Sequence, residues 1–297
     1  MTETEYKEIK LIVPWGHVAA RTYGSTTGER VLLVHGLQDN AGAYCRLMKY
    51  LPISFFYYVC IDLPGHGWSS HLPSGLIDFM DYVHALHFIL EALQWKTCTY
   101  IGHSMGGHIG LMFSIFEPYR IKKIISIDAF MLRNYYKLNM SYVTYLENAF
   151  ALSIKANKNI EPESHTKEEV LHAFKTLRFS ILNSEAVDAL FERAVTEVNG
   201  KYIYNKDIRT KYNPYLYLKD QADEFNSRLT IPIYIFVPSE GWMNGSKKSF
   251  ISSITLSSKT IIKVINVDGN HDIHNNNPEK IAPFICKILT SNNASKL

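Results

Sequence analysis

The sequence contains little cysteine, and its cysteines are not clustered. Four of them, at positions 45, 60, 98 and 286, are scattered over 297 residues, and no two form a C-x-x-C pair. This spacing provides neither a disulfide framework nor a cysteine-based metal site. The sequence therefore predicts isolated, buried thiols in a reducing compartment.

Charge and long apolar runs are also scarce. Charged residues make up 20% of the chain, the formal net charge is +3, and the basic residues are scattered, which argues against nucleic-acid binding. No apolar run approaches the roughly 18 residues of a membrane helix, and the polar start of the chain does not resemble a secretory signal. A hydrophobic fraction of 46% and an aromatic fraction of 13% nevertheless exclude a disordered chain and suffice for one large core or two small ones.

Short apolar segments alternate with helical patterns along the chain. Near-continuous apolar runs of this kind are typical of parallel strands that are buried on both faces. The predicted strands are residues 30–35, 57–62, 98–102, 122–128, 231–237 and 260–267. The predicted helices are residues 79–93, 105–116 and 278–289. The alternation predicts an open α/β sheet with right-handed crossovers.

One long stretch interrupts this rhythm. Residues 131–225 carry no strong strand signal, are mostly compatible with helix, and are too many for a loop in a compact domain. We therefore predict an α/β core of residues 1–130 and 226–297, with a helical cap inserted as residues 131–225. The cap is rich in aromatic residues. We expect most of them to form its own core and the others to line a pocket for an apolar group.

The strongest motif is GHSMGG at residues 102–107, which fits G-x-S-x-G between a predicted strand and a predicted helix. A serine at such a turn lies above the sheet, at a helix N-terminus that favours developing negative charge. Ser104 is therefore the candidate nucleophile. A serine in this role indicates acyl transfer, with attack on an ester, thioester or amide carbonyl.

The loop after the strand at residues 30–35 is the second candidate element of the site. In a hydrolase of this type, the backbone N–H groups of Leu37 and Met105 would form the oxyanion hole. We expect His35, Gly36 and His103, which adjoin these groups, to contact the substrate.

A histidine after the last predicted strand is the third element. His271, within DGNH at residues 268–271, can reach over the sheet to Ser104 and act as general base. His274 is nearby but lies further into the predicted loop, so it is the weaker candidate. The chain order, with serine before histidine, is that of the α/β-hydrolases.

With these motifs, the chain resembles the α/β-hydrolase superfamily, and most of all its serine hydrolase-like (kraken-type) branch. The resemblance rests further on VPWGHVAA at residues 13–20, DLPGHGWSS at 62–70 and DIR at 207–209. It spans nearly the whole chain and is weakest in the insertion. It implies a mostly parallel eight-stranded sheet flanked by helices, with a helical cap after strand six.

The acid of the triad is left open by the sequence. The general family pattern places an aspartate after strand seven, but Gly241 occupies that position and Glu240 lies one residue earlier. Asp128, at the end of predicted strand six, is the alternative, because some relatives carry the acid there. Asp128 and Glu240 are therefore both candidates to orient His271.

The leading functional prediction is a serine hydrolase that cleaves a carboxylic ester or thioester with a small apolar acyl group. It would act through an acyl-enzyme on Ser104, with His271 as general base. A C–C bond hydrolase and a catalytically weak binding protein with a hydrolase fold are the alternatives. No glycine-rich phosphate loop or metal-ligand cluster stands out, so we expect neither cofactor nor metal.

The chain ends in Ser295, Lys296 and Leu297. This tripeptide at a C-terminus is a peroxisomal address that an import receptor reads. The expected location is therefore the peroxisome, with that receptor as a partner, and the cytoplasm is the alternative.

Overall fold

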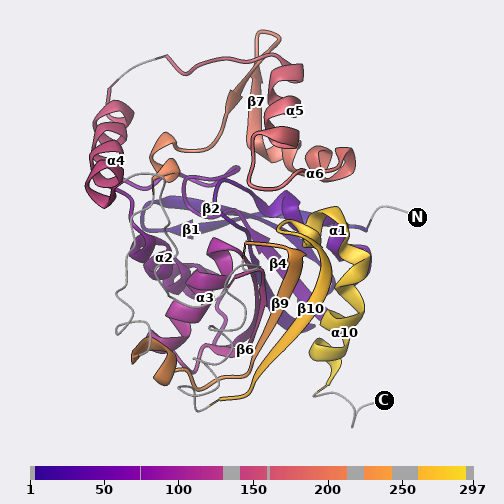
Figure 1. Ribbon diagram of the computed structural model, residues 1–297. Coiled ribbons are helices and arrows are strands. Elements are labelled where there is room, and N and C mark those ends of the chain that lie inside the picture. Colours follow the sequence, from indigo (N-terminus) through magenta and orange to yellow (C-terminus); the bar gives the residue numbers. More distant parts are fainter. Residues whose placement is uncertain are drawn as a thin grey trace.

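An eight-stranded sheet runs through the molecule (Figure 1). The computed structural model describes residues 4–73, 75–129, 141–158, 161–212, 224–242 and 260–291. The strand order in the sheet is β1-β2-β4-β3-β5-β6-β9-β10. The strands are β1 Lys7–Val13, β2 Gly16–Tyr23, β3 Glu29–Val34, β4 Phe56–Ile61, β5 Cys98–His103, β6 Ile121–Ile127, β9 Ile233–Glu240 and β10 Ile262–Asn270.

The sheet is mostly parallel. Strands β1 and β2 form an antiparallel hairpin, β2 pairs antiparallel with β4, and the remaining neighbours are parallel. The predicted eight-stranded α/β sheet is therefore confirmed, with strand ends that differ by up to three residues from the sequence prediction. Because the carboxyl ends of parallel strands meet at one edge, residues that follow β3, β5, β6, β9 and β10 gather there.

Helices cover both faces of the sheet (Figure 1). Helices α2 (Phe79–Ala92) and α3 (Met105–Phe116) pack on one face, and α1 (Cys45–Met48) and α10 (Ala282–Thr290) pack on the other. Successive residues of β3 supply these two cores in turn: Leu32 belongs to the first and Leu33 to the second. Burial on both faces explains why this strand is a continuous apolar run.

The last helix begins later than predicted. A short 3-10 helix, η3 (Pro278–Lys280), precedes α10, which starts at Ala282. Pro283 lies in the first turn of α10. Backbone N–H groups of a first turn have no acceptor within the helix, so a proline there costs no hydrogen bond. A single helix over residues 278–289 would place this proline in the second turn, where it removes a hydrogen bond and clashes with the preceding turn.

A second layer of elements, which we call the cap segment, comes between β6 and β9 and lies over the carboxyl edge of the sheet (Figure 1). Its described residues are 141–158 and 161–212. They form α4 Tyr142–Ala156, α5 Lys167–Thr176, α6 Ser184–Ala194, β7 Val195–Val198, β8 Lys201–Tyr204 and the 3-10 helix η2 Ile208–Lys211. Helices α5 and α6 share a small hydrophobic core of their own, which includes Val170, Phe174 and Leu190.

The cap segment is not entirely helical, which corrects the sequence prediction. Strands β7 and β8 form an antiparallel hairpin. Its two-residue turn is Asn199-Gly200, and both residues have positive φ, of 52° and 77°. Asn-Gly in this conformation is the preferred turn of a tight hairpin, so the dipeptide was a strand signal that helix-compatible neighbours obscured.

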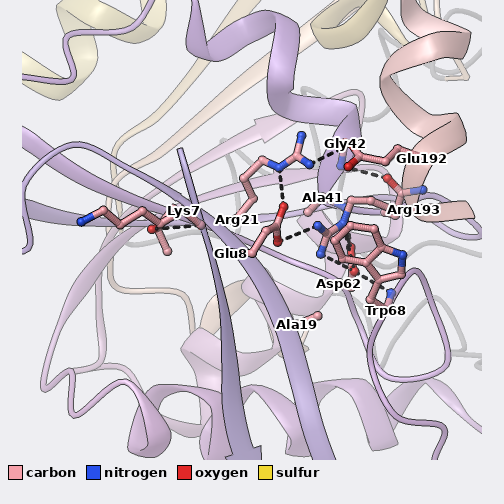
Figure 2. A network of polar contacts seen from close by, with 12 residues as sticks. Lys7, Glu8, Ala19, Arg21, Ala41, Gly42, Asp62, Trp68, Glu192 and Arg193 are labelled. Atoms are coloured by element: carbon pink, nitrogen blue, oxygen red, sulfur yellow. Dashed lines mark hydrogen bonds and ion pairs between the residues drawn. The ribbon is translucent and has the colours of Figure 1, made fainter. Parts of the chain in front are cut away.

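Helix α6 attaches the cap segment to the sheet through a buried arginine (Figure 2). Arg193 is fully buried, and its guanidinium binds Asp62, after β4, at 2.7 Å and Glu8, on β1, also at 2.7 Å. The ring of Trp68 lies 4.2 Å from the guanidinium carbon. Asp62 also accepts hydrogen bonds from the backbone N–H groups of Ala41 and Trp68. We call this set the Arg193 anchor.

Several features expected from the sequence lie outside the described residues. They include the C-terminal Ser295, Lys296 and Leu297 and the aromatic residues at positions 130, 135, 136, 215 and 217. All four cysteines are described, and each is a free thiol. In the described part of the chain, no helix combines the length and the apolar character that crossing a membrane would require.

Candidate active site

Ser104 occupies the sharp turn between β5 and α3. Its φ of 49° and ψ of −121° are sterically strained for a residue with a side chain. The backbone N–H of Ser104 donates to the carbonyl of Ile127 at 3.0 Å, which ties the turn to the end of β6. The side chain is half-buried. This is the geometry of a nucleophile at a strand-to-helix turn, partly exposed above the edge of the sheet.

His271 follows β10 at the same edge. Its Nδ1 atom lies 2.6 Å from Oδ2 of Asp128, which follows β6 and is buried. Its backbone carbonyl lies 2.9 Å from Nε2 of His103, the residue before Ser104. Because the carboxylate engages Nδ1, Nε2 is the ring atom left to accept a proton from a nucleophile.

The surroundings of His271 favour its charged form. Burial, the largest single effect, lowers the pKa of His271, but the hydrogen bond and negative charge of Asp128 together with the carboxylates of Asp272 and Asp39 outweigh it. The net result is a His271 pKa above its ordinary value. The imidazolium that forms when His271 takes up a proton is thus stabilised by its neighbours.

Asp128 reaches His271 through space that is free because residue 241 is a glycine. A Cβ atom on Gly241 would lie 2.5 Å from Oδ2 of Asp128, so no larger residue fits there without displacing the carboxylate. The backbone N–H of Trp242 donates to the same oxygen at 2.8 Å. Glu240, the other candidate acid, is exposed at the end of β9. Of the two alternatives, the structure places Asp128 against the base.

The loop after β3 passes beside the nucleophile. A Cβ atom on Gly36 would lie 3.1 Å from Cβ of Ser104 and 2.9 Å from Nδ1 of His103. Leu37 follows Gly36 in this loop, and Met105 is the first residue of α3. Of the two residues proposed to donate backbone N–H groups, Met105 thus directly follows Ser104 in the chain, and Leu37 directly follows the glycine that lies beside it.

His35 and His103 are enclosed, in contrast to the expectation that they contact the substrate. His35 is fully buried. The N–H of Leu63 donates to its Nε2 at 2.9 Å, so Nδ1 carries the proton and donates to the carbonyl of Gly36 at 2.7 Å. Burial lowers the pKa of His35, and likewise that of His103, to about 4. Both side chains are neutral parts of the support beneath the site.

His274 also belongs to this support. The sequence placed it in a loop, but it lies on the short helix α9 (Ile273–Asn276) and is fully buried. Its ring lies 4.0 Å from that of His103, which in turn lies 4.6 Å from that of His271. Burial holds the pKa of His274 well below its ordinary value. The three rings form a histidine stack of which only His271 is bound to an acid.

Arg178 is a residue of the site that the sequence did not indicate. It lies in the connector between α5 and α6, residues 177–183, and its guanidinium binds Oδ1 of Asp39 at 2.7 Å and Oδ1 of Asp272 at 3.2 Å. Asp39, His103 and Asp272 form the one cluster in the described residues with spacing that could suit a metal ion. Since Arg178 already supplies a cation to both carboxylates, we assign no metal there.

Two aromatic side chains form a wall beside the base. The ring of Phe179, in the same connector, meets the His271 ring edge-on, with centroids 5.3 Å apart and planes at 81°. The ring of Trp242 lies 5.4 Å from that of Phe179. Phe179 is 62% exposed and Trp242 is 42% exposed. An apolar group bound at His271 would therefore find two aromatic surfaces to cover.

Comparison with known proteins adds an independent view of this site. Residues 29–242 match the family model described as alpha/beta hydrolase fold. Serine hydrolase-like protein 2 of Homo sapiens is 31% identical over 299 residues, covering 95% of this chain and 93% of that protein. A serine hydrolase-like protein of Danio rerio is 29% identical over 296 residues, covering 95% and 88%.

A solved structure has the same fold. The crystal structure of the hypothetical protein PA1622 from Pseudomonas aeruginosa PAO1 superposes with a TM-score of 0.81 at 22% identity, covering 97% of this chain and 99% of that one. At this identity the likeness concerns the fold alone. Sequence and fold comparisons therefore agree over nearly the whole length of the chain.

Proposed function

Since the chain belongs to the α/β hydrolase family, and to its serine hydrolase-like branch, we propose that it is a serine hydrolase for a carboxylic ester or thioester. The observation that carries the proposal is the 2.6 Å contact between His271 and Asp128 at the edge of the sheet where Ser104 stands strained. Nucleophile, base and acid come from three parallel strands of this one edge.

The first half of the proposed reaction forms an acyl-enzyme. The Oγ atom of Ser104 attacks the carbonyl carbon, and its proton passes to Nε2 of His271. The negative charge on the carbonyl oxygen would be held by the N–H groups of Leu37 and Met105. When the C–O or C–S bond breaks, the electron pair leaves with the oxygen or sulfur, which takes the proton from His271.

The second half returns the enzyme to its starting state. Water loses a proton to Nε2 of His271 and adds to the acyl carbon. The bond to Oγ of Ser104 then breaks, and Oγ takes the proton back, so the products are a carboxylic acid and free serine. Throughout, the carboxylate of Asp128 holds the His271 ring in one tautomer.

An apolar acyl group is the proposed substrate feature. Phe179 and Trp242 stand exposed beside the base, where burial of an apolar group would contribute to binding. The alternative of a catalytically weak binding protein was based on the absence of a well-placed acid. The contact of Asp128 with His271 argues against it. No observation favours the alternative of C–C bond hydrolysis.

Labelling and turnover test the proposal together. A fluorophosphonate probe should label the wild-type protein and not Ser104→Ala, and p-nitrophenyl esters of graded chain length should be hydrolysed by the wild type alone. Absence of both labelling and hydrolysis between pH 6 and 9 would overturn the proposal. Labelling with hydrolysis only of a vinylogous 1,5-diketone, and of no ester or thioester, would favour C–C bond cleavage.

Peroxisomal delivery is a separate proposal. It rests on Ser295, Lys296 and Leu297, which form a tripeptide that an import receptor reads. A fluorescent protein fused to the N-terminus should colocalise with a peroxisomal marker and become cytosolic when these three residues are deleted. The same distribution with and without them would contradict the proposal.

A further inference from the structure

The connector of the cap segment, residues 177–183, is bound to the loops that carry the catalytic groups. Asn183 donates from its backbone N–H and its side chain to Asn276, both at 2.9 Å. The carbonyl of Ile181 accepts from the side chains of Asn270 and Asn276 at 2.9 and 2.8 Å. The connector is thus docked on the loop between β10 and α10, which contains His271.

Arg178 is the part of the connector that joins two catalytic loops to each other. Asp39 lies two residues after Leu37, and its N–H closes the loop by donating to the carbonyl of Gly36 at 3.2 Å. Asp272 directly follows His271. A single guanidinium, binding Asp39 at 2.7 Å and Asp272 at 3.2 Å, therefore connects the oxyanion-hole loop to the base.

The chemistry of this bridge makes it specific for an arginine. Asp39 and Asp272 are both buried, and two buried carboxylates near each other repel unless a cation lies between them. Burial lowers the pKa of Arg178, but the two carboxylates raise it by more, so the guanidinium stays charged. Its planar fork can bind two partners at fixed angles, which a lysine ammonium does less well.

We propose that Arg178 is a positioning residue for hydrolysis: the cap segment, through this side chain, sets the oxyanion-hole loop and His271 at their working separation. This inference rests on the proposed function, because it assigns roles to Leu37 and His271 in that reaction. It makes the cap segment a contributor to the catalytic machinery in addition to any role in covering the substrate.

The bridge also sets the electrostatic environment of the base. Among the described residues, the carboxylates that face His271 are Asp128 after β6, Asp39 after β3 and Asp272 beside it. The rings of His103 on β5 and His274 on α9 lie in the same cluster, and Arg178 on the connector binds Asp39 and Asp272. His103 and His274 have lowered pKa values and are neutral near pH 7. Loss of Arg178 would remove the guanidinium that binds Asp39 and Asp272 and leave three carboxylates around His271, so the pKa of His271 would rise.

Three variants test the proposal with steady-state kinetics on a p-nitrophenyl ester. For Arg178→Gln we expect kcat to fall about 100-fold, as a small misplacement of catalytic groups can cause, with KM changed less than about threefold. The acid limb of kcat/KM should move to higher pH. Arg178→Lys should recover at least a tenth of the wild-type kcat and return the acid limb towards its wild-type position.

Glu192→Gln is the matched control, because it also breaks an ion pair between the cap segment and the core. Glu192 binds Arg21 at 3.0 Å and touches none of the proposed catalytic residues. We expect wild-type kcat and an unmoved acid limb. Wild-type kcat and an unmoved acid limb in Arg178→Gln, even with lowered thermal stability, would mean that Arg178 is merely structural and would overturn the inference.

A second measurement separates this inference from the proposed function. An NMR titration of the His271 imidazole, assigned by its loss in His271→Gln, should show a higher His271 pKa in Arg178→Gln than in the wild type. An unchanged His271 pKa overturns the inference whether or not the wild type cleaves esters. A raised His271 pKa in a protein with no hydrolase activity upholds the electrostatic link and overturns the proposed function alone.

Discussion

Two arginines attach the cap segment to the core in the same chemical way, yet in different surroundings. Arg193 on α6 binds Asp62 and Glu8 (Figure 2), and Arg178 on the connector binds Asp39 and Asp272. Each arginine thus joins two carboxylates of the core. In the Arg193 anchor the guanidinium and Asp62 are fully buried and Trp68 covers the guanidinium, whereas the Arg178 bridge adjoins His271 and the exposed ring of Phe179.

The difference shows how one kind of ion pair can serve attachment or catalysis. The Arg193 anchor lies between β1, β4 and α6 and involves none of the proposed catalytic residues, so its loss should affect folding. The Arg178 bridge holds residues that flank the oxyanion-hole loop and the base, so its loss should affect turnover. Variants of the two regions should therefore separate stability from activity.

The largest expected effect comes from Asp128→Asn, within the site. We expect kcat to fall about 10⁴-fold, because the His271 ring loses the carboxylate that fixes its tautomer and stabilises its charge. The free energy of unfolding should change little. Without the negative charge the His271 pKa falls, so the acid limb of kcat/KM should move to lower pH, opposite to Arg178→Gln. A kcat within tenfold of wild type would show that Asp128 is not the orienting acid.

The next largest effect is expected at the anchor, for Arg193→Met. The free energy of unfolding should fall by about 3–5 kcal/mol, since Asp62 remains buried without its cation. Urea unfolding followed by tryptophan fluorescence measures this. Any protein that stays folded should keep a kcat within about twofold of wild type.

Glu192→Gln is the control for this loss of unfolding free energy, because Glu192 binds Arg21 at the edge of the same network. The Glu192 side chain is 56% exposed, so the loss of its charge should cost less than about 1 kcal/mol. A fall in the free energy of unfolding for Arg193→Met no larger than that for Glu192→Gln would mean that the Arg193 anchor contributes no more than an exposed ion pair. The proposed difference between the two regions would then be wrong.

An effect smaller than those of Asp128→Asn and Arg193→Met is expected for Phe179→Ala, at the edge of the site. Loss of an apolar contact of about 1–2 kcal/mol should raise KM for a long-chain p-nitrophenyl ester about tenfold and leave kcat nearly unchanged. Short-chain esters should be less affected. Phe284→Ala removes another half-exposed phenylalanine, on α10 at a face of the sheet, and should leave the chain-length profile of KM unaltered.

Much of the fold could be predicted because its signals are local. The apolar runs of the inner strands β3, β5 and β6 reflect burial on both faces, and GHSMGG at residues 102–107 shows both the turn and its nucleophile. The hairpin of β7 and β8 was missed although Asn199-Gly200 marks it, because helix-compatible neighbours outweighed one dipeptide. The start of α10 depended on the position of Pro283 within its first turn.

The site was less predictable because its contacts are distant in sequence. Asp128 and His271 are 143 residues apart, and Arg178 is 139 residues from Asp39 and 94 from Asp272. No local pattern distinguishes Asp128 from Glu240, since the choice depends on space beside Gly241 that only the folded chain reveals. Likewise, an arginine in a helix connector has no sequence feature that marks it as part of a catalytic centre.

The enclosed histidines beneath the nucleophile have a thermodynamic consequence. His35, His103 and His274 are held neutral, with pKa values below the ordinary 6.5. As the medium is acidified below that value, the unfolded chain takes up protons that the native chain excludes, so the free energy of unfolding declines between pH 6.5 and about 4. His271, with its raised pKa, takes up its proton above pH 6.5, so its stabilising contribution is already present there and does not offset this decline. The layer of imidazoles that supports the site thus makes unfolding a proton-consuming process and the native state sensitive to mild acid.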